Sequence, residues 1–162
     1  MSIPERIERE IVVDAPPDVV WSILTEPDQM TQWLADEVEL VLQPGGDGTL
    51  RWHSRVFRSA GSASKTLPIR VERVEPPHRF SFRWEAPADE AVLAGNSMLV
   101  EFTLAVEGEG TRLRVVESGM REVQRPDDEM AHYVDEHARG WSLLLVRLAS
   151  YLGDLRPRHP GE

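Results

Sequence analysis

The sequence contains no cysteine and almost no lysine. Without cysteine the chain has no disulfide, no thiol nucleophile and no thiolate ligand for a metal ion. That absence suits the reducing cytoplasm, where we expect the protein to reside. Lys65 is the only lysine among the 18 basic residues, and we attribute this arginine bias to genome composition.

Long apolar segments are also missing. No run of about 18 or more apolar residues occurs, so the sequence predicts no transmembrane helix. Residues 1–6 lack the apolar segment of a signal peptide. Acidic residues outnumber basic residues by 28 to 18, which gives a formal net charge of −10. Because this charge repels phosphate backbones and anionic headgroups, we expect neither nucleic acid nor a membrane as a partner.

The motifs for metal, phosphate and nucleophilic chemistry are incomplete. Glu129 and His132 have Glu-x-x-His spacing, but a carboxylate metal site needs a second such pair and further glutamates. Gly45–Gly48 lacks the Lys-Ser/Thr that follows a phosphate-binding loop. There is no Gly-x-Ser-x-Gly elbow to present a nucleophilic serine. We therefore expect no metal and no cofactor, and we assign no catalytic residue.

Apolar residues recur at steps of three and four near the end of the chain, between Tyr133 and Leu152. This spacing predicts one amphipathic helix over residues 128–152. Acidic residues in the first turn favour its start, and Gly153 is expected to end it in a left-handed conformation. At ~1.5 Å per residue, such a helix is about 35–40 Å long and needs a sheet to cover its apolar face.

Most of the chain before this helix alternates between apolar and polar residues, as half-buried strands do. Two short helices should follow the first strand, the second ending near Trp33, and a short helical piece is expected around residues 90–93. The predicted strands cover residues 7–14, 38–42, 49–57, 67–74, 80–84, 98–106 and 111–118.

This order of elements predicts an α+β protein. We expect one domain over residues 1–162, with its core at about 7–153 and a flexible tail at 154–162. Six or seven antiparallel strands should form a curved sheet around the long C-terminal helix.

Several short motifs, taken in their order and spacing, resemble those of the START/SRPBCC superfamily. In chain order they are Asp14–Trp21, Trp33, Pro44–Gly46, Val74–Phe80, Gly110–Leu113 and Gly140–Trp141. They are similar to the branch named for the activator of the heat-shock protein 90 ATPase. The resemblance covers about residues 7–152 and implies a helix-grip fold with an apolar cavity. The loop 85–96 and the connection 119–126 are longer than in the family. The resemblance therefore does not determine the shape of the cavity mouth.

The resemblance implies no uniform activity, because relatives include ligand carriers, aromatic cyclases, stress-linked proteins and co-chaperone domains. We expect the chain to bind a hydrophobic or amphipathic small molecule, as a monomer or weak dimer. One alternative is a co-chaperone-like domain that stimulates a heat-shock protein 90-type ATPase. Another is a cyclase or hydrolase that uses Glu117 and His137 as acid and base.

Glu117 and His137 form the most informative pair. Strand alternation puts Glu117 on the same face as Leu113 and Val115, toward the long helix, and His137 lies on the apolar side of that helix. A carboxylate in an apolar interior is costly unless paired. Glu117 therefore either reaches water or an arginine for structural reasons, or joins His137 as the polar part of a ligand cavity. The residues expected to line that cavity are Trp33, Trp52, Ser54, Phe80, Phe82, Trp84, Phe102, Glu117, Tyr133, His137, Trp141 and Leu144.

Overall fold

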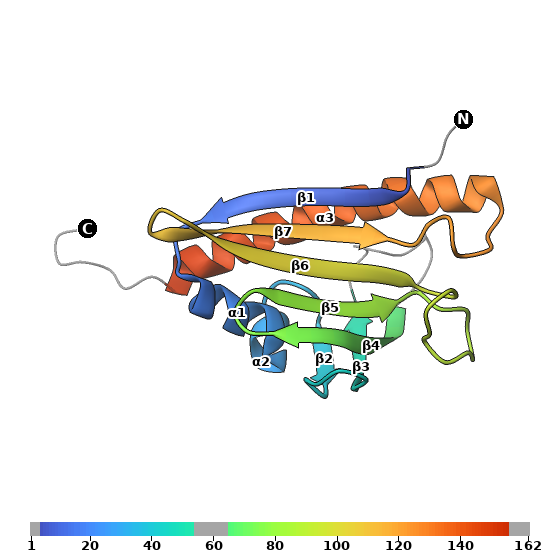
Figure 1. Ribbon diagram of the computed structural model, residues 1–162, viewed down its shortest axis with the longest axis horizontal. Helices are drawn as coiled ribbons and strands as arrows, with labels where there is room; N and C mark the ends of the chain where they lie inside the picture. Colours follow the sequence, from blue (N-terminus) through green and yellow to red (C-terminus); the bar gives the residue numbers. More distant parts are fainter. Residues whose placement is uncertain (1–3, 54–64, 156–162) are drawn as a thin grey trace.

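Seven antiparallel strands form one curved sheet in the computed structural model, which describes residues 4–53 and 65–155 (Figure 1). The strands are β1 (Arg6–Val13), β2 (Glu37–Leu40), β3 (Asp47–Trp52), β4 (Lys65–Glu75), β5 (Arg79–Trp84), β6 (Met98–Glu107) and β7 (Gly110–Ser118). Their order across the sheet is β1-β7-β6-β5-β4-β3-β2. Strands β2 to β7 therefore pair in chain order, and β1 adds to the sheet beside the last strand.

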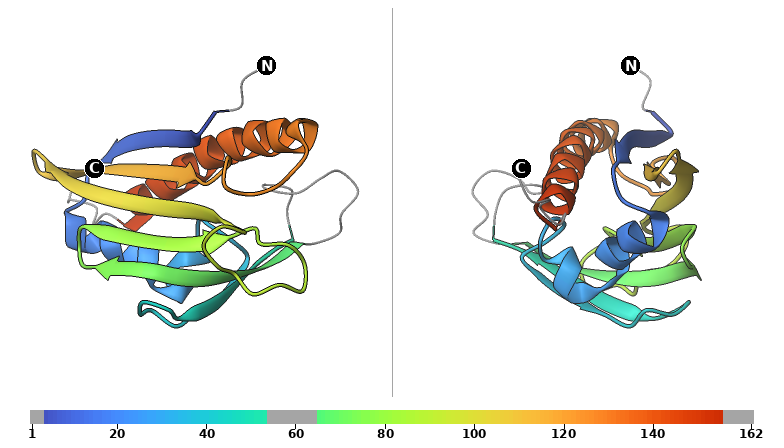
Figure 2. Two further views of the ribbon diagram at one scale, coloured as in Figure 1. Left: turned by 45° about the vertical axis from the view of Figure 1, so that its right-hand side comes forward. Right: turned by 90° about the vertical axis from the view of Figure 1, so that its left-hand side faces the viewer.

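Three helices complete the fold. The short helices α1 (Pro17–Thr25) and α2 (Pro27–Met30) connect β1 to β2, and α3 (Asp127–Leu155) follows β7. Figure 2 shows the sheet curving around α3, with β1 beside the helix. The side chain of Arg9 on β1 donates to Ser142 Oγ on α3 at 3.0 Å, which links the sheet edge to the helix. The predicted α+β helix-grip architecture is confirmed.

The core lies between the concave face of the sheet and α3, because strand alternation sends every second side chain to that face. On β5 these residues are Phe80, Phe82 and Trp84, each 0% exposed. The apolar side of α3 meets them through residues such as Trp141, which is also 0% exposed. The ring centroids of Trp84 and Trp141 lie 5.6 Å apart, so the indoles themselves join sheet to helix.

The end of α3 differs from the sequence prediction. Gly153 does not stop the helix, because α3 continues to Leu155 and Gly153 is not among the glycines with positive φ. A Cβ added at Gly153 would meet nothing within 4 Å. A glycine near the end of an apolar pattern is a frequent stop but not an obligatory one, because the hydrogen bonds of the helix can pass through it.

Other details of the secondary structure also differ from the prediction. Residues 90–93 form a bend and irregular chain, so the predicted helical piece is wrong. Helix α2 ends at Met30, and hydrogen-bonded turns continue to Leu34, so Trp33 lies in a turn. Strand β2 ends at Leu40, two residues before the predicted end. The predicted strand at 49–57 corresponds to β3 as far as Trp52, and its part from residue 54 lies outside the described residues.

Candidate functional site

Glu117 is fully buried, and its carboxylate accepts hydrogen bonds from four side chains. Its Oε2 atom accepts from Trp84 Nε1 at 2.8 Å and from the Tyr133 hydroxyl. Its Oε1 atom accepts from Trp141 Nε1 at 2.8 Å and lies 2.8 Å from His137 Nδ1. A carboxylate has about four lone-pair positions, so these four partners satisfy it.

His137 lies between two carboxylates. Its Nδ1 atom faces Glu117, and its Nε2 atom is 3.1 Å from Oε2 of Glu85. Both nitrogen atoms therefore serve as donors, as they do in an imidazolium. Burial lowers the pKa of His137, but the charges and hydrogen bonds of Glu117 and Glu85 outweigh that effect and raise the pKa to about 9.

Glu85 connects this interior group to the surface. It directly follows β5, has a positive φ of 62°, and points its carboxylate inward so that Oε2 also accepts from Lys65 Nζ at 2.8 Å. The Lys65 side chain is 22% exposed and that of Glu85 is 11% exposed. We call the series Glu117, His137, Glu85 and Lys65 the acid–base chain, because negative and positive groups alternate along it from the core to the surface.

The two carboxyls of the acid–base chain are held ionised. Burial raises the pKa of Glu117, but the charge of His137 and the side-chain donors outweigh it and hold this pKa below 4.5. Burial likewise raises the pKa of Glu85, and the hydrogen bond of His137 and the charge of Lys65 outweigh that effect. The phenol of Tyr133 has a pKa well above 10, because it is buried and faces the negative charges of Glu117 and Glu85.

Most of the predicted site residues lie around the acid–base chain. Trp84, Tyr133, His137 and Trp141 contact Glu117 directly. Phe82 packs on Trp84 with ring centroids 5.5 Å apart, Trp52 does so at 6.0 Å, and Phe102 packs on Trp141 at 5.8 Å.

The other predicted site residues lie farther from Glu117. Phe80 stacks on Phe102, and Trp33 also meets Phe102, both one ring away from Trp141. The indole of Trp33 donates to the Ile23 carbonyl at 2.8 Å, and Leu144 is a buried core residue. Ser54 lies outside the described residues.

The sequence analysis did not predict three residues of this site: Lys65, Glu85 and Arg125. Each stands at a strand end or in a connection, where no periodic pattern says which way a side chain points. Arg125 donates to the Glu85 carbonyl at 3.0 Å, and its guanidinium carbon lies 5.0 Å from the centre of the Tyr133 ring. One signal was available: Lys65 is the only lysine in the chain.

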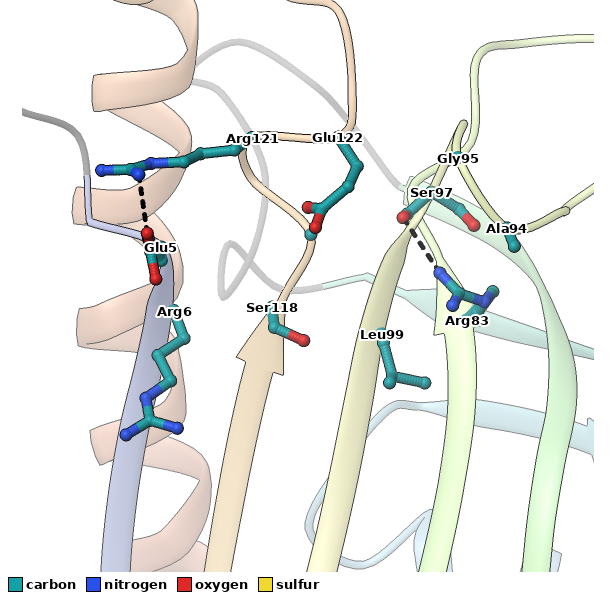
Figure 3. Close-up of a pocket in the computed structure, with 11 residues that line it drawn as sticks. Glu5, Arg6, Arg83, Ala94, Gly95, Ser97, Leu99, Ser118, Arg121 and Glu122 are labelled. Atoms are coloured by element: carbon teal, nitrogen blue, oxygen red, sulfur yellow. Dashed lines mark hydrogen bonds and ion pairs between the residues drawn. The ribbon is translucent and has the colours of Figure 1, made fainter.

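Three surface pockets formed by described residues lie away from the acid–base chain. The pocket in Figure 3, of about 530 Å³, is formed at one end of β1, β7, β6 and β5. Its cations already have partners: Arg121 pairs with Glu5 at 2.6 Å, and Arg83 donates to the Ser97 carbonyl at 3.4 Å. These pairs compete with any charged ligand, so the pocket is a weaker candidate than the acid–base chain.

Two kinds of site are absent from the described residues. No group of three or more His, Asp or Glu side chains within residues 4–53 and 65–155 is arranged to hold a metal ion. None of the helices in the same ranges has the length and apolar character needed to cross a bilayer.

Comparison of the sequence with known protein families gives a match. Residues 14–153 match the family described as Activator of Hsp90 ATPase homolog 1-like protein, or AHSA1. The chain belongs to the AHSA1 family. This confirms the resemblance seen in the sequence, and the match includes every residue of the acid–base chain. The comparison with curated proteins gives no match.

Solved structures of several proteins are similar to this AHSA1 chain. Protein MLL2253 from Mesorhizobium loti is 23% identical with a TM-score of 0.73, over 94% of this chain and 99% of that chain. DynU16, a putative protein in the dynemicin biosynthetic locus, is 26% identical with a TM-score of 0.68, over 95% of this chain but 49% of that chain. The Aha1 dimer from Colwellia psychrerythraea, a solution structure, is 20% identical with a TM-score of 0.63, over 91% of this chain and 95% of that chain. The similarity to MLL2253 and to the Aha1 dimer, at 23% and 20% identity, shows a shared fold.

Proposed function

We propose that this AHSA1 protein binds a hydrophobic or amphipathic small molecule between the sheet and the N-terminal half of α3. The observation that carries the proposal is the acid–base chain, which places four ionisable side chains in or beside an aromatic interior. Small-molecule sites combine an apolar lining with a few convergent polar groups in this way.

Stability alone is a poor explanation for these buried charges. Removing a carboxylate or an imidazolium from water costs several kcal/mol per ion, roughly, and a well-packed apolar replacement is often neutral or stabilising. Glu117 is 0% exposed and His137 is 1% exposed, so both bear that cost in full. Buried ionisable groups with shifted pKa values concentrate at functional sites, which supports a role beyond folding.

The surface end of the acid–base chain is the better place for the polar part of a ligand. Glu117 has its four acceptor positions filled, and both nitrogens of His137 have carboxylate partners. A ligand would have to break one of these bonds to reach either side chain. Glu85 uses Oε2 for its two partners, and its side chain is 11% exposed, so it is the carboxylate of the acid–base chain that a ligand can approach from outside, beside Lys65.

The same geometry disfavours an acid–base enzyme built on Glu117 and His137. A general base needs a free lone pair near neutral pH. His137 is protonated on both nitrogens with a pKa of about 9, and the pKa of Glu117 is held below 4.5. The small-molecule role is consistent with DynU16, the similar protein that comes from a biosynthetic locus.

A second candidate is a protein-interaction domain that acts on a chaperone ATPase. The family description favours it, and so does the outer side of α3, where Leu143 is 44% exposed and Val146 is 65% exposed. Exposed apolar side chains three positions apart share one helix face and suit a protein partner. In this case Leu143→Ser and Val146→Ser should abolish stimulation of a heat-shock protein 90-type ATPase, whereas Glu85→Gln should not.

The small-molecule proposal is tested by native mass spectrometry of the protein purified from its own host, followed by titration of defined ligands. Dodecanol, dodecanoate and dodecylammonium are suitable probes, with tryptophan fluorescence as the readout because Trp84 and Trp141 contact Glu117. We expect a bound small molecule, and we expect Glu85→Gln to alter probe affinity. The matched control Glu72→Gln lies on the outer side of the sheet and should not. Absence of a retained molecule, together with no binding of any of the three probes, would overturn the proposal.

A further inference from the structure

Arg125 is a half-buried cation at the surface end of the acid–base chain. One terminal nitrogen donates to the Glu85 carbonyl, and the guanidinium lies over the Tyr133 ring. No carboxylate among the described residues forms an ion pair with it, although Asp127, Asp128 and Glu129 follow closely along the chain. This is unexpected in a protein whose acids outnumber its bases by 28 to 18.

Among the described residues, the charges around Glu85 do not balance without a further anion. Lys65 and Glu85 form one opposite pair, and His137 and Glu117 form another. Arg125 is the fifth charged group and leaves the cluster with one positive charge in excess. A partly buried charge without a counter-ion is costly, so the cluster favours one additional negative group beside the guanidinium.

We infer that the ligand of this site carries an anionic head group such as a carboxylate, which Arg125 binds while the apolar part faces the aromatic interior. This inference rests on the proposed function. Two features of the geometry support it. The planar guanidinium has further N–H donors in the fork arrangement that fits a carboxylate, and its position over the Tyr133 ring holds it in place before the ligand arrives.

Glu85 does not prevent such binding. Its Oε2 atom is neutralised on two sides, by Lys65 at 2.8 Å and by His137 at 3.1 Å. Arg125 contacts the main-chain carbonyl of Glu85, whereas Lys65 and His137 hold its carboxylate. An anion on Arg125 therefore adds to the cluster without replacing an existing pair.

The test compares three ligands that share one twelve-carbon tail: dodecanoate, dodecanol and dodecylammonium. Their affinities are measured with the full chain by tryptophan fluorescence and by calorimetry, below the critical micelle concentration. We expect dodecanoate to bind most tightly. Arg125→Gln should weaken dodecanoate by about tenfold and leave dodecanol within about twofold, because a charge-assisted pair is lost only in the first case.

Two further variants separate binding from folding. Arg125→Lys keeps the charge but loses the fork, so it should recover part of the dodecanoate affinity. Arg147→Gln removes the same charge from an exposed position on α3 and should change neither ligand. Thermal unfolding of each variant verifies that it is folded.

The outcomes distinguish this inference from the proposed function. If no probe binds, the proposed function itself fails. If dodecanol binds as tightly as dodecanoate, or if Arg125→Gln weakens both equally, the small-molecule role stands and the anionic head group is wrong. A preference for dodecylammonium would likewise overturn the inference and point to Glu85 as the recognising group.

Discussion

Glu117 shows how one interior residue fixes the positions of several others. Its carboxylate accepts from side chains on two different elements, Trp84 on β5 and Tyr133, His137 and Trp141 on α3. Each of these donors would lose a buried hydrogen bond without it. A single strand residue therefore determines where three side chains of α3 must lie relative to the sheet.

Replacing Glu117 with glutamine should be strongly destabilising. An amide keeps the size but offers one acceptor oxygen in place of two, and its NH₂ faces two N–H or O–H donors. It also leaves the His137 imidazolium without its buried counter-ion. We expect a loss of about 3–5 kcal/mol in the free energy of unfolding, measured by urea titration.

The matched control is Glu101→Gln, which removes a charge from the convex face of β6. We expect a change within about 0.5 kcal/mol for this variant. Equal effects of the two substitutions would show that the four donors do not depend on Glu117.

His137 should make stability depend on alkaline pH. Its pKa is about 9 in the folded protein against the ordinary value of 6.5. Because the folded value is the higher, its contribution is fully present below pH 6.5 and is lost as the pH rises through about 9. The difference corresponds to a loss on the order of 3 kcal/mol. Unfolding titrations between pH 6 and 10 measure the loss, and NMR of the imidazole follows the proton directly.

The groups that face His137 determine this behaviour: Glu117, Glu85 and Tyr133. In Glu117→Gln, the imidazole should titrate at a lower pH than in the wild type, since one of its two counter-ions is gone. An NMR midpoint near 6.5 in the wild-type protein would contradict the buried arrangement. On the acid side, the pKa values of both glutamates are lowered, so their contribution is present above 4.5 and is lost as the pH falls below it.

At the scale of elements, periodic patterns predicted the fold well. The positions that recur at steps of three and four from Tyr133 to Leu152 are buried on α3, and alternation placed Phe80, Phe82 and Trp84 correctly on one face of β5. Single residues at the ends of elements were predicted less well. Glycine is the residue type that most often ends a helix, but the residue type at position 153 does not show that the helix continues to Leu155.

Gly153→Ala tests this correction. Because Gly153 is helical and a Cβ there meets nothing within 4 Å, alanine should stabilise the protein by about 0.5–1 kcal/mol. A glycine in the left-handed conformation would give the opposite sign. Gly119 provides that comparison: its φ is +106°, and an added Cβ would lie 3.3 Å from the Ser97 carbonyl oxygen. We expect Gly119→Ala to be destabilising by roughly 1–2 kcal/mol in the same denaturant titration.

For the molecule as a whole, the two sheet edges differ. The β1 edge lies beside α3, whereas β2 at the other edge has four residues and, within residues 4–53 and 65–155, pairs with β3 alone. The central strands have neighbours on both sides. Cooperative opening starts where few contacts hold a segment, so stability should fall from β6 toward β2.

Native-state hydrogen exchange should show this gradient. We expect the amides of β5, β6 and β7 to exchange last and those of β2 to exchange first among the strands. Mass spectrometry of peptides that separate Glu37–Leu40 from Met98–Glu107 measures both in one experiment. Protection of β2 equal to that of β6 would mean that another segment or molecule covers this edge.

The candidate site was predictable only in part for a reason that concerns the whole fold. Glu117 and His137 lie on regular elements, so alternation and helical spacing placed them face to face. Glu85, Lys65 and Arg125 come from three separate connections or strand ends. The pairing of β4 with β5 brings Lys65 near Glu85, and the connection before α3 brings Arg125 to the same place. Local sequence carries little information about such long-range proximity.

The position of Lys65 gives the site a chemical handle. Since the chain has one lysine, a reagent that acylates amines can modify a side chain only at the surface end of the acid–base chain. The rate at which Lys65 is modified reports how often its ammonium leaves Glu85 and loses its proton. A molecule seated beside Glu85 should slow this modification, which is followed as a mass increment on the peptide that contains Lys65 and so is separated from acylation of the α-amino group. Covalent footprinting can therefore detect occupancy of the site in a crude extract, before any ligand has been identified.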